Sequence, residues 1–495
     1  MRHAPEIELA LPPRPADMPR QTWLYGQIRA AILDGTLAPG TRLPASRDLS
    51  QRLGLARGTV LTVFAQLAAE GYVVGRVGRG SFVAPELPDQ RPASPDHPPT
   101  AEAQVGTAGL SARGRVLART IFPLSAPDWP IPAFRASQPD IAAFPVGLWA
   151  RIAARRGRLS QRALLTDGDA LGYGPLRAAI ADHLRAGRGI ACTAGQVAIL
   201  ASVQQLLDLS ARLLLDPGDQ AWLEDPGYPG ARLILEAAGA RVVGVPVDAG
   251  GLDVGHGVAQ APAARLAYVT AGRQAPLGSS LALDRRLALL DWARTAKAVI
   301  IEDDYDSEFR FEGNPLAALK SLDRSGSVIY AGTFSKLMFP ALRLAYAVLP
   351  DALVDPFQAA MSLTCRHAAL GSQAVLHDFI AEGHLARHVR RMRLHYGERA
   401  QALAAAAQTH LAGMLDLPTI AAGLDAPAFL PAGIDDRKAV ALAAAAGIET
   451  RPLSFYRVDG PVRPGLVLGF AAISPAAIET GARGLAEALS PLCRG

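Results

Sequence analysis

The chain has 495 residues, of which half are hydrophobic and 19% are charged. This composition predicts a globular protein of two or three domains and excludes an extensively disordered one. The sequence shows no signal peptide and no apolar run long enough to span a membrane, so we expect a cytoplasmic protein. The three scattered cysteines have neither the spacing of a metal site nor that of a disulfide framework: Cys192, Cys365 and Cys493.

The positive charge of the chain is concentrated near its N-terminus. Residues 20–83 contain eight arginines, no lysine and three acidic residues, so this segment carries all of the net charge of +5 and the remaining residues sum to zero. A local excess of positive charge is the electrostatic property that contacts with a phosphate backbone require. We therefore expect a small nucleic-acid-binding module in this segment.

Residues 22–83 have the pattern of three helices followed by a hairpin. Apolar residues recur at helical spacing over 22–34, Ser46 is a suitable N-cap for a short helix over 47–53, and a third helix opens at Thr59 and stops at 70–71. Residues 72–83 then have the pattern of a β-hairpin with a tip rich in glycine and arginine. This order is the plan of a winged helix-turn-helix domain.

The segments Arg42–Leu49 and Glu70–Tyr72 closely resemble the GntR family of winged helix-turn-helix domains. The resemblance implies double-stranded operator DNA as a partner, with the start of the third helix in the major groove and the hairpin near the minor groove or the phosphates. For any single arginine, a solvated surface charge is the alternative. The residues that the resemblance nominates for DNA contacts are Arg47, Arg57, Thr59, Thr62, Arg76 and Arg79.

After the predicted DNA-binding domain, at 20–84, the sequence changes character twice. Residues 85–120 contain six prolines between Ala84 and Arg119 and little periodicity, which predicts an extended linker. From residue 121 onward, apolar β-like runs alternate with helical ones as far as about Asp351, and a helix-rich and then mixed segment follows. This order predicts an α/β domain at 121–495, with a mostly parallel sheet covered by helices and a smaller α+β C-terminal lobe.

Two of the expected strands end in groups that pyridoxal 5'-phosphate (PLP) requires. The run Val328–Ala331 leads to Lys336, and the run Ala298–Ile301 leads to Asp303. The ends of such strands meet at one edge of an α/β sheet, where ligands bind. A lysine amine can form a Schiff base with PLP, and a carboxylate can keep the pyridine ring protonated. The alternatives are a surface lysine and a strand-end acid.

Several further segments resemble the fold type I PLP-dependent enzymes of the aminotransferase class. They are Gly172–Arg177, Glu224–Pro229, Glu302–Phe309, Gly332–Lys336 and Phe379–His384. Together with the GntR-type module, they make the chain similar to the MocR family of bacterial transcription regulators from Trp23 to the C-terminus. Neither half alone would distinguish a regulator from an enzyme.

This resemblance implies a role for each residue of a PLP site. Lys336 would bind the cofactor covalently, Asp303 would hold the protonated pyridine nitrogen, and Tyr305 would bond the phenolic oxygen. Tyr228 would stack on the ring, although a turn tyrosine is the alternative there. Tyr173 would reach the site of a neighbouring subunit. The residues implied for the phosphate are Ser202, Val203 and Gln204, through their backbone N–H groups, with Thr333 and Arg343.

The sequence departs from the family pattern around the expected cofactor pocket. Residues 272–276 read Gly-Arg-Gln-Ala-Pro where the family usually has Ser-His-Gln-aromatic-Pro, so Arg273 and Ala275 are unusual. We hypothesise a different effector or weaker cofactor binding. Arg451 is the nearest candidate for binding an effector carboxylate, since a guanidinium binds carboxylates bidentately, and Arg273 is a second candidate.

The sequence as a whole predicts a PLP-dependent DNA-binding transcription regulator that senses a small amine, an amino acid or PLP itself, as a homodimer. A catalytically active aminotransferase with an appended DNA-binding domain is one alternative, and a regulator that has lost PLP is another. Residual transaminase activity stays open. No metal site is expected, because His367, His377, His384 and His388 lie on helical segments without a paired metal spacing.

Overall fold

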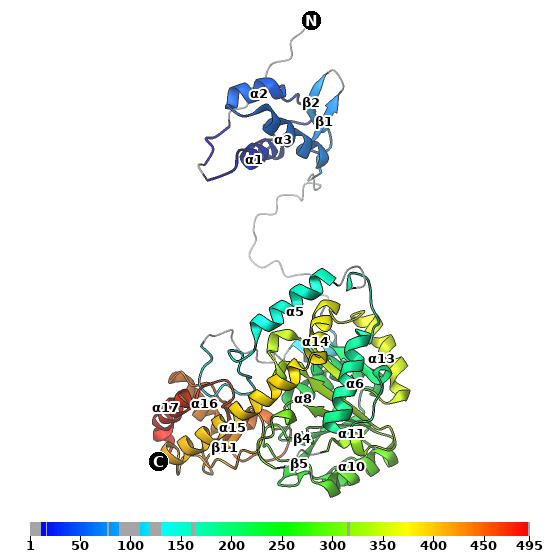
Figure 1. Ribbon diagram of the computed structural model, residues 1–495, viewed down its shortest axis with the longest axis vertical. Helices are drawn as coiled ribbons and strands as arrows, with labels where there is room; N and C mark the ends of the chain where they lie inside the picture. Colours follow the sequence, from blue (N-terminus) through cyan, green and yellow to red (C-terminus); the bar gives the residue numbers. More distant parts are fainter. Residues whose placement is uncertain are drawn as a thin grey trace. The chain divides into compact units, whose positions relative to one another are not determined.

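The computed structural model describes residues 11–15, 17–76, 79–88, 109–118, 130–159, 164–313 and 317–493. The chain forms two compact units, residues 1–108 and residues 109–495, which are drawn in blue and in cyan to red in Figure 1. Of the predicted linker at 85–120, residues 89–108 and 119–120 lie outside the described residues. Its described part includes helix α4 (Ala112–Ala118), which packs against helix α8 (Pro229–Ala238) of the larger unit.

The small unit is a winged helix-turn-helix domain, as predicted. Its elements are α1 (Arg20–Leu33), α2 (Ser46–Leu53), α3 (Arg57–Ala69), β1 (Val73–Arg76) and β2 (Gly80–Val83). The strands pair antiparallel, with Val73 opposite Val83. Residues at helical spacing on α1 pack with residues of α2 and α3 in one core that includes Trp23, Leu24, Ile28, Ile32, Leu49, Val60 and Leu67.

All three helices of this unit begin earlier than the sequence pattern predicts, and α1 begins at Arg20 rather than at residue 22. Helix α2 includes Ser46 as its first residue, so the N-cap position belongs to Ala45, which makes no side-chain capping bond. Helix α3 begins at Arg57 rather than at Thr59, because Ala56 takes the extended N-cap conformation. The earlier start places Arg57 in the first turn of α3.

The larger unit is built on an eight-stranded sheet with the order β3-β10-β9-β8-β7-β4-β5-β6. Strands β5, β4, β7, β8 and β9 are parallel neighbours, whereas β10 and β6 run antiparallel to the strands beside them. The prediction of a mostly parallel sheet is confirmed. The strands are β3 (Val197–Leu200), β4 (Gln220–Asp225), β5 (Arg241–Asp248), β6 (Gly251–Leu252), β7 (Leu266–Val269), β8 (Val299–Asp304), β9 (Val328–Thr333) and β10 (Ala345–Val348).

Helices cover both faces of this sheet (Figure 1), because strand side chains alternate between two apolar cores. Ile301 packs with residues of α7, α8 and α13, whereas its neighbour Ile300 packs with residues of α10. In the second core, the rings of Trp222 and Trp292 stack with their centroids 3.7 Å apart. The helices of this part are α5 (Val146–Leu159), α6 (Gly174–Arg188), α7 (Val203–Leu214), α8, α9 (Val254–Gln260), α10 (Leu283–Ala296), α11 (Leu319–Leu322), α12 (Phe334–Leu337), α13 (Asp351–Thr364) and α14 (Leu370–Ala381).

The C-terminal lobe is a smaller α+β structure, as predicted. The long helix α15 (His384–His410) leads into a three-stranded antiparallel sheet with the order β11-β13-β12. An earlier segment of the chain joins this lobe, because Phe134 forms a β-bridge with Gly469. The remaining elements of the lobe are β11 (Asp425–Phe429), α16 (Asp436–Ala445), β12 (Arg451–Pro452), β13 (Gly465–Gly469) and α17 (Pro475–Cys493).

Four short 3-10 turns connect these elements among the described residues: η2 (Ala194–Gln196), η3 (Ser307–Phe309), η4 (Pro340–Leu342) and η5 (Leu453–Tyr456). Within that same part of the chain, none of the helices combines the length and the apolar character that crossing a membrane requires.

Candidate functional site

A cavity of about 420 Å³ lies at the carboxyl ends of strands β4, β7, β8 and β9. One wall is formed by residues 136–138 and by the start of α7. The C-terminal lobe closes another wall through Asp425, Arg451, Tyr456 and Val467. This is the edge at which open α/β sheets bind their ligands.

Nine of the ten residues predicted to bind PLP line this cavity. The exception is Tyr173, which occupies the N-cap position of α6 and presents its ring edge to His377, with 6.0 Å between the ring centroids. The other residues come from four strand ends and the start of α7, so the fold brings together segments that are far apart in the sequence. The lining residues are Ser202, Val203, Gln204, Tyr228, Asp303, Tyr305, Thr333, Lys336 and Arg343.

Lys336 is held by a single helical turn. Helix α12 follows β9 directly and is capped by Thr333, whose hydroxyl accepts a hydrogen bond from the Ser335 N–H. The Lys336 Nζ donates to the Ser137 carbonyl oxygen at 2.6 Å. Burial lowers the pKa of Lys336 from its usual value, and Asp425 opposes this effect. A larger share of the amine is therefore unprotonated and nucleophilic than in an exposed lysine.

Asp303 presents a carboxylate oxygen that lacks a partner. Its Oδ2 accepts a hydrogen bond of 2.6 Å from the Tyr268 hydroxyl, whereas its buried Oδ1 has no hydrogen-bond partner among the described residues. Burial raises the pKa of Asp303 to about 7, with the Tyr268 hydrogen bond acting in the opposite direction. A buried acceptor that lines a cavity without a partner suits a ligand that brings a proton, such as a protonated ring nitrogen.

Another group of residues in the cavity lining suits an anion. Ser202 is the N-cap of α7, where its hydroxyl accepts from the Gln205 N–H at 3.1 Å, and the N–H groups of the first turn carry the positive end of the helix dipole. Arg343 adds a cation to the cavity lining and makes no ion pair with any described residue. These groups are the donors that a phosphate requires.

Arg273 does not line the cavity, contrary to the prediction that it could bind an effector carboxylate. Its Nη1 donates to the Tyr305 hydroxyl at 2.8 Å and to Asp306 Oδ2 at 3.0 Å, and its Nη2 donates to Asp425 Oδ1 at 3.1 Å. Two buried carboxylates therefore already neutralise this guanidinium. Arg451 does line the cavity, has its guanidinium 6.0 Å from the centroid of the Phe455 ring and has no carboxylate partner among the described residues.

Several lining residues escaped the sequence analysis. Tyr268 lies in an apolar run of β-like residues at 265–269, and only the observed pairing of β7 with β8 brings its hydroxyl to Asp303. Asp425 and Tyr456 belong to the C-terminal lobe, and only the folded chain brings them to this cavity. Ser137 takes a left-handed backbone conformation, with φ 59°, which no sequence pattern indicates.

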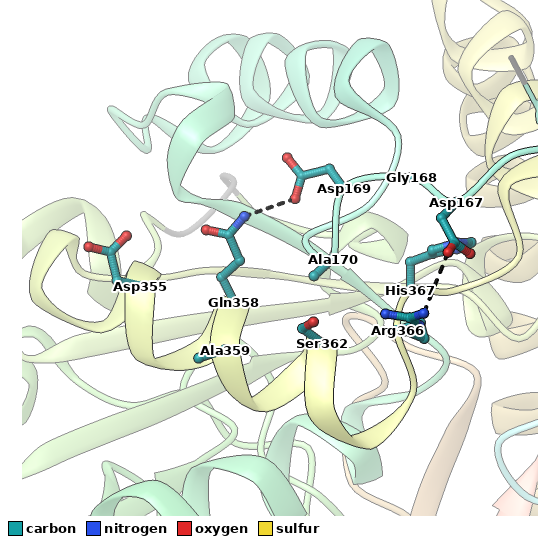
Figure 2. A pocket seen from close by; sticks show the side chains of 10 residues that line it. All are labelled: Asp167, Gly168, Asp169, Ala170, Asp355, Gln358, Ala359, Ser362, Arg366 and His367. Atoms are coloured by element: carbon teal, nitrogen blue, oxygen red, sulfur yellow. Dashed lines mark hydrogen bonds and ion pairs between the residues drawn. The ribbon is translucent and has the colours of Figure 1, made fainter.

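A second hollow, of about 480 Å³, lies on the larger unit near Tyr173 in the sequence. Figure 2 shows helix α13 facing the loop 167–170, with Gln358 bonded to Asp169 and Arg366 close to Asp167. Two of the most exposed apolar side chains of the described residues flank these segments: Leu165 is 85% exposed and Leu363 is 87% exposed.

The residues predicted to contact DNA are available on the small unit. Arg76 lies with its guanidinium over the Phe82 ring, 5.0 Å from the centroid, and Thr62 donates its hydroxyl to the Gly58 carbonyl. None of the four arginines of this set pairs with a carboxylate among the described residues. Five members of the set are exposed, namely Arg47, Arg57, Thr62, Arg76 and Arg79, and Thr59 is half-buried.

The two units match two protein families. Residues 21–83 match the bacterial regulatory proteins of the gntR family, and residues 143–463 match the class I and II aminotransferases. Over 482 residues the chain is 40% identical to the probable rhizopine catabolism regulatory protein MocR of Rhizobium meliloti, and the match covers 97% of this chain and 95% of that protein. The chain belongs to the MocR-type regulators of the gntR family. This assignment confirms the resemblance that the sequence motifs indicate.

Other matches support both the regulator assignment and the aminotransferase fold of this MocR-type chain. It is 32% identical to the pyridoxine biosynthesis transcriptional regulator PdxR of Corynebacterium glutamicum, over 80% of both chains. The crystal structure of LysN, an alpha-aminoadipate aminotransferase of Thermus thermophilus complexed with N-(5'-phosphopyridoxyl)-L-leucine, is 28% identical with a TM-score of 0.68. It covers 73% of this chain and 92% of LysN. The family makes the protein a DNA-binding transcription regulator and favours this function over that of an active aminotransferase. The aminotransferase fold implies PLP as the cofactor.

Proposed function

We propose that this protein is a homodimeric regulator that binds PLP at Lys336 and changes its affinity for operator DNA when a small amine or amino acid binds in the same cavity. The observation that supports the proposal most is that Lys336, Asp303 and Arg451 line one cavity. The cavity thereby combines an amine that can react with the PLP aldehyde, an acid for the ring nitrogen and a cation for a carboxylate. A regulator of operator DNA acts where the chromosome is, so we retain the cytoplasm as its location.

Different residues of the chain would bind different parts of the cofactor. When bound, PLP supplies an electrophilic carbon that reacts with primary amines. Lys336 provides the attachment point, since burial keeps its amine partly unprotonated. Asp303 would hold the proton of the ring nitrogen at its unpartnered Oδ1, and Tyr228 would cover one face of the ring. The start of α7 and Arg343 would bind the phosphate.

The effector would be an amine that also carries a carboxylate. Arg451 belongs to β12 of the C-terminal lobe and lines the same cavity as Lys336 and Asp303 of the large sheet's edge. A guanidinium that lacks a carboxylate partner is the side chain best suited to bind one bidentately. Because Arg451 belongs to the lobe, an effector held by both Lys336 and Arg451 would favour one position of the lobe over others. PLP as the effector is the alternative.

A change at this cavity affects DNA binding only if the effector binds one arrangement of the protein better than another. By linkage, the same free energy then appears as a change in DNA affinity on adding the effector and as a change in effector affinity on adding DNA. This reciprocity gives a direct check on the proposal, because both affinities can be measured on the same protein.

The dimer would use the surface around the second hollow. Three features favour a second copy there: a concave region lined by α13 and the loop 167–170 (Figure 2), the exposed Leu165 and Leu363, and Tyr173, which follows this loop in the sequence and does not line its own cavity. Exposed apolar side chains around a polar hollow are typical of protein interfaces. Leu363→Glu should give a monomer by sedimentation if this surface forms the dimer, and an unchanged dimer would contradict it.

The test of the proposed function combines an absorption spectrum with DNA binding. Wild-type protein loaded with PLP should show a visible band that Lys336→Ala lacks. A panel of amino acids is then screened for changes in that band and in the affinity for a duplex selected from a random pool by the wild-type protein. A wild-type protein that stays colourless would overturn the cofactor assignment, and a band without any amine-dependent change in DNA affinity would overturn sensing.

An active aminotransferase is the second candidate, because Lys336 and Asp303 retain the groups that transamination uses. The family assignment favours the regulator. A steady-state assay over many amino donors distinguishes the two functions: turnover comparable with ordinary transaminases would favour the enzyme.

A further inference from the structure

Arg273 lies at the junction of three segments of the larger unit. It follows β7, it donates to Tyr305 and Asp306 just after β8, and it donates to Asp425 at the start of β11 in the C-terminal lobe. Arg273 is 4% exposed, so its contacts are shielded from water. One side chain thus joins the edge of the large sheet to the lobe that covers the cavity.

The Arg273 guanidinium occupies the space where a side chain of residue 423 would otherwise lie. Gly423, two residues before β11, has φ +95°, and a Cβ atom there would lie 2.3 Å from both Cζ and Nε of Arg273. A glycine is required at this point because any side chain would collide with the guanidinium and would strain the backbone. The backbone of Gly423 therefore bounds one side of the space that the Arg273 guanidinium occupies.

The hydrogen bond between Arg273 and Tyr305 has only one possible direction. A guanidinium carries donors and no acceptor, so the Tyr305 oxygen accepts and its own hydrogen is left for another acceptor. Burial raises the pKa of Tyr305 well above its usual value, so the hydroxyl keeps that hydrogen, while the charge of Arg273 acts in the opposite direction. Tyr305 lines the cavity and Arg273 does not. The tyrosine therefore stands between the arginine and whatever the cavity binds.

We propose that Arg273 is a positioning residue that acts through Tyr305 on the phenolic oxygen of the bound cofactor and makes this contact depend on the position of the C-terminal lobe. The inference rests on the proposed binding of PLP at Lys336. Two donors in series strengthen each other, so the Arg273 bond makes Tyr305 a better donor. If the C-terminal lobe moves Asp425 away from the cavity, it also pulls Arg273 away from Tyr305, because Arg273 is bonded to both residues. The hydrogen bond that Tyr305 donates to the cofactor then becomes weaker.

A change in the hydrogen bond from Tyr305 should change how tightly the Lys336 nitrogen holds its proton. A weaker hydrogen bond leaves more negative charge on the phenolic oxygen, and that charge holds the nearby proton at Lys336 Nζ more tightly. The pH midpoint of the visible absorption of the loaded protein should then rise. The charged groups that face this amine are Asp425, Arg451, Asp306 and Asp303, and the test variants keep all four.

The experiment is a spectrophotometric pH titration of the PLP-loaded full chain. Arg273→Lys keeps the positive charge that Asp306 and Asp425 need but loses the planar fork that reaches Tyr305. Gly423→Ala keeps the arginine but crowds it. Both variants should raise the midpoint by about half to one pH unit, the size expected for one weakened hydrogen bond. Arg310→Lys, a change in a nearby arginine that donates to Ser280 and not to Tyr305, should leave the midpoint unchanged.

A double-mutant cycle with Tyr305→Phe separates this role from a structural one. In the Tyr305→Phe background, Arg273→Lys should cause no additional shift, since the route through the hydroxyl is already removed. An unchanged midpoint in both Arg273→Lys and Gly423→Ala would overturn the proposal, as would a full additional shift in the Tyr305→Phe background. A colourless wild-type protein would overturn the proposed cofactor binding together with this inference, so the two failures are distinguishable.

Discussion

Replacing Asp303 by asparagine should stabilise the protein without cofactor and weaken its binding of PLP. Burial raises the pKa of Asp303 to about 7, whereas an aspartate in an unfolded chain titrates near its usual value. Between these two pKa values the folded chain keeps a proton that the unfolded chain has lost, so stability falls as pH rises through this window. At about 1.4 kcal/mol per pKa unit, the cost of ionising Asp303 amounts to at most about 4 kcal/mol above neutral pH.

Asparagine cannot ionise, so it avoids this cost. Its Oδ1 can still accept the Tyr268 hydrogen bond, but its amide group would then face the cavity with N–H donors, opposite a protonated ring nitrogen. A hydrogen bond between charged groups contributes about 1.5–3 kcal/mol, so the loss of this one should weaken PLP binding by about 10- to 100-fold.

The assays are urea unfolding of the cofactor-free protein in acidic and in mildly basic buffer, and a titration with PLP. The Asp303→Asn variant should have the higher unfolding midpoint in basic buffer, and its midpoint should approach that of the wild type in acidic buffer. Wild-type PLP affinity in the variant, or a variant less stable than the wild type in basic buffer, would contradict the reasoning.

Three other changes test separate parts of the molecule. Arg57→Ala should weaken DNA binding and lower the salt dependence by about one phosphate contact, whereas the exposed Arg437→Ala on α16 should do neither, as measured by fluorescence anisotropy at several salt concentrations. Arg451→Ala should reduce the spectral response to L-alanine by about tenfold or more and leave the response to ethylamine unchanged; equal losses would contradict a carboxylate contact. Burial lowers the pKa of His388 to about 4, so as pH falls this histidine takes up a proton in the unfolded chain before it does so in the folded chain. The free energy of unfolding should therefore fall by up to about 3 kcal/mol as pH drops from about 6.5 to 4. In urea unfolding over this pH range, the His388→Gln variant should lose less stability than the wild type.

The sequence predicts most of the cofactor site because that site is built at strand ends. Asp303 and Lys336 each follow a recognisable apolar run, and parallel strands carry both groups to the same edge of the sheet. The winged helix is predictable for a similar reason, since its helices follow one another with short turns and each has an apolar face. In both cases, short apolar patterns in the sequence are enough to predict which segments lie side by side.

The contacts of Arg273 could not be predicted in this way. The sequence marks Arg273 as unusual, but its partner Asp425 lies 152 residues further along the chain, in a different sheet. The room that it occupies depends on the backbone of Gly423. An arginine near a cofactor pocket suggests a ligand contact, and only the packed structure reveals that buried acids already hold it. Tyr173 is the N-cap residue of α6 and does not line its own cavity, which is a property of the fold that the sequence motif does not reveal.

The route of the chain into the cavity determines where this protein can be divided. Helix α4 packs against α8, and the N-cap residue of α8 is Tyr228, which lines the cavity. Further along the chain, Phe134 pairs with the C-terminal lobe, and the carbonyl oxygen of Ser137 accepts a hydrogen bond from the Lys336 amine. Both contacts lie upstream of residue 143, where the aminotransferase match begins. A chimera that joins a foreign DNA-binding domain before Gly109 would keep them. One that joins it at residue 143 would preserve the recognisable domain and cut away part of its binding site.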